Sequence, residues 1–281
     1  MKIGNLSKWL FILPALITGF GWVPIGQATA QTFTTLHNFN DHNFNDDGYY
    51  PVGGLISSGS TLYGTTQGGG SQNSGTVYAI NTDGTGFTIL YSFAASDGEY
   101  PQAGLILSGN ILYGTTSPVD TIFDTNVCGM VFAVHTDGTG FTTLHSFTAI
   151  GIHRYDTNSD GAWPTTAGLI LSGDTLYGTT YFGGSSGNGT VFALNTNGTG
   201  FTSLYDFAAG NDQGMPNAVI LSGDTLYGTT YEGGTNRAGS VFALKIHGTY
   251  FTILHSFAGS DGASPWGGLI LSGNTLYGTT T

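Results

Sequence analysis

Apolar residues in this chain occur in short runs separated by Gly, Asn, Asp, Ser and Thr, and the order of the runs repeats. The motif LYGTT occurs five times, with spacings of 50, 64, 50 and 50 residues, starting at Leu62, Leu112, Leu176, Leu226 and Leu276. The motif Phe-Thr-x-Leu precedes each copy, starting at Phe33, Phe87, Phe141, Phe201 and Phe251. A third motif, Gly-[Thr/Met/Ser]-Val-[Phe/Tyr]-Ala, starts at Gly75, Gly129, Gly189 and Gly239. Self-similarity with a period near 50 residues indicates a repeat architecture.

Each repeat predicts four short β-strands, which we term types A, B, C and D. In the third repeat they are Gly168–Ser172, Thr175–Thr180, Gly189–Leu194 and Phe201–Phe207. All are rich in β-branched and aromatic residues and bounded by turn residues, and no stretch has helical periodicity. Two residues, such as Gly173-Asp174, join strand A to strand B in every repeat. Such pairs supply the positive φ of a tight hairpin turn.

The apolar residues of strand C are continuous rather than alternating, as in Val191–Leu194. A continuous run is typical of a sheet that is covered on both faces. A four-stranded unit of this length is the size of a propeller blade, whose two faces pack on neighbouring blades. The sequence therefore predicts an all-β fold, a β-propeller of about five four-stranded blades. A linear β-solenoid is the alternative, although its coils are shorter and usually lack tight antiparallel hairpins.

The four strand types do not occur equally often in the sequence. Types A, B and D occur five times each and type C four times, which makes 19 strands. The chain opens with a D strand, Phe33–Phe39, and stops after a B strand, Thr275–Thr280. Either these two strands pair and close a five-bladed ring with an incomplete last blade, or the chain is a fragment of a longer array. An apolar strand makes a poor exposed edge, which favours closure.

All variation in repeat length lies in two kinds of connector. The A–B turns and the C–D connectors keep their length, whereas the B–C and D–A connectors vary. In a propeller these two variable kinds share one face, which we term the connector face. Variable loops on a rigid scaffold are where binding sites are usually built.

The two longest connectors are consecutive, Ser117–Cys128 and Thr148–Pro164, and we expect them to touch. The ligand-binding residues predicted there are Asp120, Asp124, Arg154, Tyr155, Asp156, Asp160 and Trp163. Carboxylates accept hydrogen bonds from hydroxyls, Arg donates them, and aromatic rings stack on the C–H faces of sugars. The predicted partner is therefore a glycan or another polar extracellular ligand. Alternatively, the loops only cover each other, or the insertion is tolerated without a ligand.

The element Asp-Gly-x-x-Pro recurs in the D–A connectors. Its aspartates are Asp47, Asp97, Asp160 and Asp261, with Asp212 in a longer variant. Asp-Gly followed by Pro is first of all a turn that delivers the chain into strand A. The alternative is a ring of aspartates that binds a cation or ligand at the central mouth. Calcium loops need several converging oxygens rather than one per repeat, so no metal site and no cofactor is predicted.

Catalytic motifs are missing from the sequence. His37, His145 and His255 occupy one repeat position at which Tyr91 and Tyr205 also occur, which indicates a framework role. There is no HExxH helix, GxSxG elbow or phosphate loop. The only cysteine, Cys128, rules out an internal disulfide and is expected to be buried. We expect no enzyme activity, and a carboxylate pair for glycoside hydrolysis is the remaining alternative.

The first 30 residues have the pattern of a secretory signal peptide. Two lysines precede an apolar run, Trp9–Ile25, and Ala28-Thr29-Ala30 forms a cleavage site with cleavage after Ala30. This leaves one repeat domain, 31–281, in which no segment is long and apolar enough for a membrane span. A retained membrane anchor is the alternative. Three basic and 17 acidic residues remain, a net charge of −14, which excludes nucleic acid as a partner. A secreted or cell-surface location is expected.

The repeat motifs resemble a known class of proteins. LYGTT, then a double glycine such as Gly183-Gly184, then GTVFALNTNGTGF is similar to the tandem repeat of the GloVer class of exported bacterial proteins. The resemblance covers nearly all of 31–281 and implies a surface or extracellular location and a propeller-like fold. The double glycine is more distantly similar to kelch blades. No catalytic residue is implied, and a structural or adhesive interaction module is the alternative function. The class pairs such repeats with varied C-terminal anchors, and we expect this chain to depart from the class in that respect.

Overall fold

The structure is a computed structural model that describes residues 33–39, 47–117, 128–151, 153, 156–165, 168–208 and 214–281. The chain divides into two compact units, Met1–Thr34 and Thr35–Thr281. In the described ranges, no helix has the length and apolar character needed to cross a bilayer.

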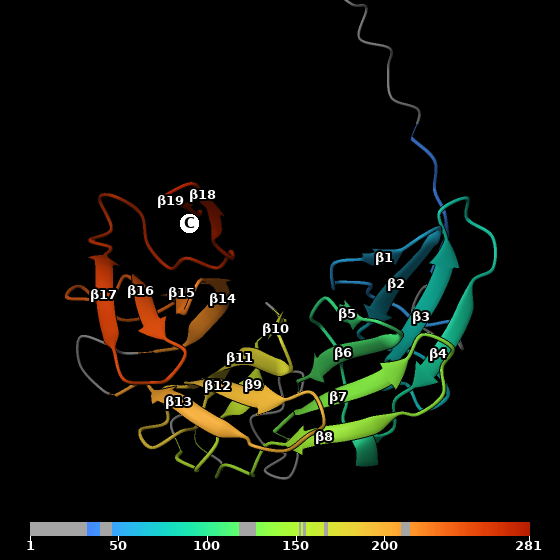
Figure 1. The fold of residues 1–281 in the computed structure, drawn as a ribbon, viewed down its shortest axis with the longest axis horizontal. Helices are drawn as coiled ribbons and strands as arrows, with labels where there is room; N and C mark the ends of the chain where they lie inside the picture. The colour runs from blue at the N-terminus through green and yellow to red at the C-terminus, as the bar shows by residue number, and fades with distance from the viewer. Residues whose placement is uncertain are drawn as a thin grey trace, which may run out of the picture. The chain divides into compact units, whose positions relative to one another are not determined.

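The second unit is built from antiparallel sheets in which four strands follow one another in chain order (Figure 1). The first sheet contains β1 (Ile56–Ser58), β2 (Thr61–Thr66), β3 (Thr76–Asn81) and β4 (Thr88–Ser92). The second contains β5 (Ile106–Ser108), β6 (Ile111–Thr116), β7 (Met130–His135) and β8 (Thr142–Ser146). A short 3-10 turn, Ala95–Asp97, lies between these two sheets in the chain.

The third and fourth sheets repeat this plan. The third contains β10 (Ile170–Ser172), β11 (Thr175–Phe182), β12 (Thr190–Asn195) and β13 (Thr202–Asp206), and an added strand, β9 (Ala162–Pro164), pairs with β11. The fourth contains β14 (Pro216–Ser222), β15 (Thr225–Thr230), β16 (Ser240–Lys245) and β17 (Phe251–Ser256). The last sheet has two strands, β18 (Ile270–Ser272) and β19 (Thr275–Tyr277). Apart from β9, these strands are the predicted types A to D, in the predicted order.

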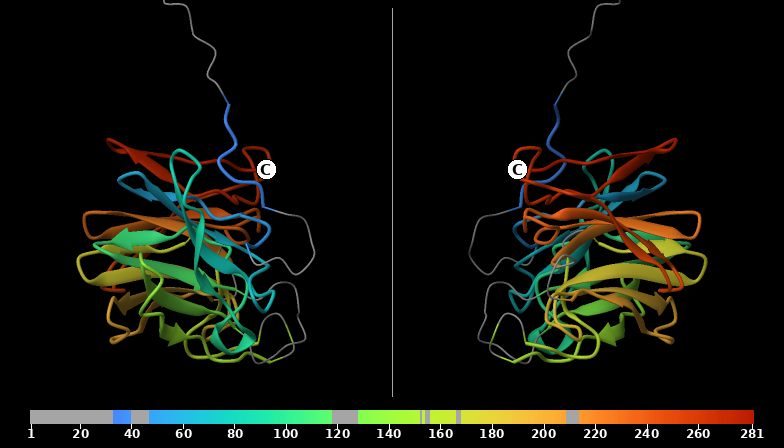
Figure 2. Two further views of the ribbon diagram at one scale, coloured as in Figure 1. Left: turned by 90° about the vertical axis from the view of Figure 1, so that its right-hand side faces the viewer. Right: turned by 90° about the vertical axis from the view of Figure 1, so that its left-hand side faces the viewer.

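The local geometry of each sheet follows from its repeated residues. The A–B hairpins turn on a glycine with positive φ, such as Gly173 at 58°, which glycine adopts without the steric cost of a side chain. In Figure 2 these hairpin turns reach towards the same side of the unit. Strands B and C then pair over six residues, for example from Thr175↔Asn195 to Thr180↔Thr190.

Aromatic side chains join each sheet to the next. Tyr91 of β4 stacks on Phe141 at the start of β8, with ring centroids 3.7 Å apart. Phe93, just after β4, meets Phe132 of β7 edge-on at 5.1 Å. The same two contacts recur between later sheets and bury Val, Leu and aromatic residues between them. Four-stranded sheets that pack face to face in chain order are the blades of a propeller-like all-β fold, as the sequence predicts.

The N-terminal segment of this unit does not close the last blade as expected. Residues 35–39 form no strand, and β19 pairs only with β18 among the described residues. His37 instead stacks on Phe87 at 3.8 Å, and Phe39 meets Tyr78 at 5.1 Å. These are the contacts that a D strand makes with the following sheet. Residues 35–39 therefore pack on the first sheet as strand D of one sheet packs on the next sheet in the chain. The expected pairing with Thr275–Thr280 is wrong for the described residues.

Candidate functional site

The B–C and D–A connectors meet through a backbone bridge that recurs along the chain. At its centre is the residue before the connector proline, which has φ between 46° and 59° in all five copies, Tyr50, Tyr100, Trp163, Met215 and Ser264. Non-glycine residues adopt such φ values only when their surroundings hold them there. The surroundings here are hydrogen bonds to two different sheets.

The bridging residue donates its N–H to the B–C connector of the preceding sheet. The bonds are Tyr100 to Ser74, Trp163 to Cys128, Met215 to Asn188 and Ser264 to Ala238, at 2.8–2.9 Å. Its carbonyl accepts an N–H from the residue after strand B of its own sheet. These bonds are Gln67 to Tyr50, Ser117 to Tyr100 and Tyr231 to Met215. Because each bridge joins both kinds of connector, the two kinds lie on one face, the connector face.

The two long connectors touch, as predicted, through the bond from Trp163 N–H to the Cys128 carbonyl at 2.9 Å. The equivalent bond joins the shorter connectors, so the contact belongs to the repeat and does not depend on the insertions. Four of the predicted site residues, Asp120, Asp124, Arg154 and Tyr155, lie outside the described residues. The other three, Asp156, Asp160 and Trp163, can be placed.

Asn158, which the sequence did not single out, organises the described part of the inserted connector. Its side-chain N–H groups donate to the carbonyls of Thr148 and Gly161, both at 2.8 Å. Its side-chain oxygen accepts from the N–H groups of Gly161 at 2.9 Å and Gly184 at 2.8 Å. One amide thus ties the insertion to the B–C connector that follows β11. Asp156 is also used internally, because it accepts the His153 N–H at 2.9 Å.

Asp160 is buried, and its carboxylate oxygens accept hydrogen bonds from neighbouring residues. It accepts hydrogen bonds from the Thr148 N–H at 3.1 Å and the Thr148 hydroxyl, and it pairs with His145 Nε2 at 2.9 Å. Burial raises the pKa of this carboxyl, but the hydrogen bonds from His145 and Thr148 outweigh it and leave the pKa below its ordinary value. Asp160 therefore fastens the end of strand D to the turn that begins the next repeat.

The same contact, in which a connector aspartate bonds to the ring side chain near the end of strand D, occurs in other repeats, and we term it the clasp. His37 pairs with Asp47 at 3.3 Å and His255 with Asp261 at 2.9 Å. Tyr91 donates its hydroxyl to Asp97, and burial together with this bond raises the Tyr91 pKa. The interchange of His and Tyr at one repeat position thus has a single structural cause. The geometry favours the turn interpretation of Asp-Gly-x-x-Pro, and no three metal-ligating side chains cluster in the described part of the chain.

Trp163 is half-buried and packs edge-on against Phe182 at 5.0 Å. The more accessible aromatic residue is Trp266, which follows the connector proline of the last repeat and is 58% exposed. Its ring lies 4.9 Å from Tyr231 and is stacked at 6.3 Å, 12° from parallel, on Tyr181. We term Tyr181, Tyr231 and Trp266 the aromatic patch.

The aromatic patch draws one residue from each of three consecutive repeats. Tyr181 and Tyr231 directly follow LYGTT, where other repeats have Gln67 and Ser117. Sequence reasoning missed the patch because its members lie 50 and 35 residues apart and lengthen no loop. Alignment of the five repeats could have shown the signal, since the position after LYGTT is aromatic in the third and fourth repeats and polar in the other three, as Gln67, Ser117 and Thr281.

Comparison with known proteins identifies the repeat. The family model of the Gloeobacter/Verrucomicrobia repeat matches residues 25–221 and 124–281. No curated protein matches the chain. Among solved structures, the nidogen/laminin complex is similar over 79% of this chain and 68% of that chain, at 17% identity and a TM-score of 0.48. A structure assigned as TolB from Agrobacterium tumefaciens is similar over 70% of this chain and 61% of that chain, at 13% identity and a TM-score of 0.44.

Proposed function

This chain belongs to the Gloeobacter/Verrucomicrobia repeat family, and from that premise we propose that it is an exported, non-enzymatic propeller that binds a glycan or another polar ligand on its connector face. The last hairpin counts as the incomplete fifth blade. The ligand site is the aromatic patch, in place of the inserted connector, because the described polar residues of that connector bond to one another.

The observation that supports this proposal is the exposed ring of Trp266 beside Tyr231 and Tyr181. A large aromatic side chain left in water loses the free energy that burial would supply, so an exposed cluster marks a surface that another molecule covers. Tyr and Trp combine an apolar face with a polar edge, which suits a ring with C–H groups on its faces and hydroxyls at its rim. The formal net charge of −12 disfavours anionic ligands.

A glycan array followed by calorimetry on the hits tests the proposal. Trp266→Ala should weaken binding about tenfold or more, the scale expected when a central aromatic contact is removed. The matched control is Tyr250→Ala, because Tyr250 is 69% exposed but lies on the C–D connector before β17, away from the connector face. Both variants should melt close to the parent, since neither side chain is part of the core.

Three results would refute the binding proposal. They are no bound glycan on the array, equal affinity of the Trp266→Ala protein and the parent, and an equal loss in the Tyr250→Ala protein. Release of reducing sugar from a bound polysaccharide would replace it with the enzymatic alternative. Export is tested separately, because N-terminal sequencing of protein recovered outside the producing cell should begin at Gln31.

A further inference from the structure

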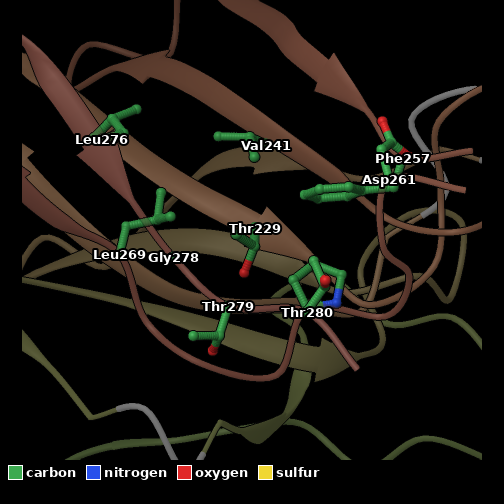
Figure 3. A pocket seen from close by; sticks show the side chains of 10 residues that line it. Thr229, Val241, Phe257, Asp261, Leu269, Leu276, Gly278, Thr279 and Thr280 are labelled. Atoms are coloured by element: carbon green, nitrogen blue, oxygen red, sulfur yellow. The ribbon is translucent and has the colours of Figure 1, made fainter. Parts of the chain in front are cut away.

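The aromatic patch is an open surface and not a pocket. Trp266 is 58% exposed, and the rings of Tyr181 and Tyr231 are half-buried. The cavity of about 260 Å³ that borders the last hairpin is lined by other residues, among them Leu269 and Leu276 (Figure 3). A surface cannot orient a ligand by enclosing it. The relative orientation of the patch rings therefore depends on the structure that supports them.

Strand β11 is longer than the equivalent strands because the inserted connector pairs with its end. It has eight residues, whereas β2, β6 and β15 have six. Its last two residues are Tyr181 and Phe182, and the pair Phe182↔Ala162 joins them to β9, at the end of the inserted connector. In the fourth repeat the strand ends at Thr230, and Tyr231 lies in a bend. The inserted connector therefore places Tyr181, but not Tyr231, within a paired strand.

Phe182 connects the inserted connector to the aromatic patch through a row of rings. Its side chain is buried and meets Trp163 of the connector edge-on, with centroids 5.0 Å apart. It also meets Tyr181 edge-on at 5.0 Å, and Tyr181 is stacked on Trp266 at 6.3 Å. Closely packed side chains transmit a displacement from one to the next. The fourth repeat cannot form such a row, because it has Glu232 at the position of Phe182.

Asn158 fastens the chain just beyond this row. Its backbone N–H donates to the Gly184 carbonyl at 3.2 Å, and its side-chain oxygen accepts the Gly184 N–H at 2.8 Å. Because Gly184 is two residues after Phe182, these two bonds fix the end of β11 from the other side. Other connectors have Ala95 and Gly259 at the position of Asn158, two residues before the clasp aspartate. Neither residue has a side-chain amide that could make these bonds.

We propose that the inserted connector braces the aromatic patch, with Asn158 and Phe182 as positioning residues for the Tyr181 ring. They hold this ring 12° from parallel to the ring of Trp266. Two rings whose mutual angle is fixed before the ligand arrives lose little conformational entropy on binding, and they offer every ligand the same contacts. This role rests on the proposed ligand site, and it gives the longest connector a function without any direct contact to the ligand.

Fluorine NMR of protein labelled with 5-fluorotryptophan tests the brace without any ligand. Trp163 and Trp266 are the only tryptophans after residue 30, and Trp266→Phe assigns their two signals. Asn158→Ala should move the Trp266 signal towards its position in the Tyr181→Ala protein, because both changes release the same ring contact. The matched control is Asn195→Ala, which should leave the signal in place, since the Asn195 side chain bonds within the C–D connector of the same repeat.

Phe182→Leu keeps the test decisive if Asn158→Ala lowers the melting temperature too far. It retains an apolar side chain at the buried position and removes the ring that touches Tyr181. It should move the Trp266 signal in the same direction as Asn158→Ala. The proposal is overturned if both variants leave that signal unchanged, or if the Asn195→Ala control moves it as far.

The immobilised neutral oligosaccharides of the glycan array separate the brace from the proposed function. On those that the parent binds, Tyr181→Ala should weaken binding about tenfold and Asn158→Ala about threefold or more. The double variant should bind no more weakly than Tyr181→Ala, because Asn158 acts through Tyr181. Additive losses would overturn the positioning role. If the parent binds no glycan, the proposed function fails, and the NMR comparison still decides whether the connector braces the patch.

Discussion

The fourth sheet and the last hairpin differ far more in burial than in sequence. Strands A and B read VILSGDTLYGTT in the fourth sheet and LILSGNTLYGTT in the hairpin, and their pairing has the same register. Leu226 is completely buried, whereas the equivalent Leu276 is only half-buried. Residues of the partner strands differ in the same direction, because Ile220 is half-buried and the equivalent Ile270 is 68% exposed. In the fourth sheet, strands A and B are joined by strands C and D, whereas the hairpin consists of strands A and B alone. A blade of this protein is therefore buried mainly by the strands that come after it, and strands A and B cannot bury themselves.

The largest effect should come from removing a strand-C ring that is buried between two neighbouring sheets. Phe242→Ala removes a fully buried ring and should lower the free energy of unfolding by about 3–5 kcal/mol. Phe257→Ala, just after β17 in the last complete sheet, should cost clearly less because its ring is only half-buried. Urea unfolding of both variants measures the difference. Equal losses would show that Phe257 is covered in solution as completely as Phe242.

The clasp aspartates give the next largest difference. Asp160→Ala leaves the Thr148 N–H and the half-buried His145 ring without their buried acceptor, and should cost about 1–3 kcal/mol. Asp261→Ala should cost less, because both members of the His255 pair are exposed to solvent. The two variants are compared by urea unfolding at neutral pH. A larger loss at Asp261 would contradict the role of burial.

The clasp also predicts a pH dependence with a definite sign. The pKa of Asp160 is lower in the folded protein than its ordinary value of about 3.9. Its contribution is therefore complete above that value and is lost as the pH falls through the folded pKa. The stability gap between the parent and Asp160→Asn should stay constant from about pH 7 to pH 5 and shrink below pH 4. A gap that grows on acidification would contradict this assignment.

A smaller effect is expected at two equivalent glycines of the LYGTT motif, Gly228 and Gly278. Gly228→Ala brings a Cβ to 2.5 Å from the Phe242 ring, and should cost about 1–3 kcal/mol by overpacking. Gly278→Ala should change stability by less than about 0.5 kcal/mol, because only Leu269 is near and can move. The pair is compared by thermal unfolding. Equal costs would mean that strand conformation, and not the Phe242 ring, requires glycine here.

The smallest expected effect is that of a metal chelator. The aspartates of the described connectors bond to backbone and ring groups, and no three of the described metal-ligating side chains converge. Calcium cages that contribute to folding would lower the melting temperature by several degrees when emptied. Excess EDTA should shift it by less than about 1 °C. A larger shift would place a metal in the long connectors.

The strands and their order could be predicted because their signals are local and repeated. The Gly-containing pairs between strands A and B make tight turns in any context, and the predicted Thr175–Thr180 appears as Thr175–Phe182. The candidate site was harder to predict. Asp156 and Asp160 have the composition of ligand-binding residues, but the structure uses both for hydrogen bonds inside the connector. Composition alone does not distinguish these roles, because the same carboxylate oxygens serve either.

The sequence by itself determined the repeat, the strand types, the tight hairpins and the separation of constant turns from variable connectors, since each depends on residues close together in the chain. Only the tertiary structure decided which side chains are shared between repeats. Asn158 reaches Gly184, and the aromatic patch joins three repeats. The physical reason is that burial and hydrogen-bond partnership belong to pairs of neighbouring sheets, and no single repeat encodes its neighbour's surface.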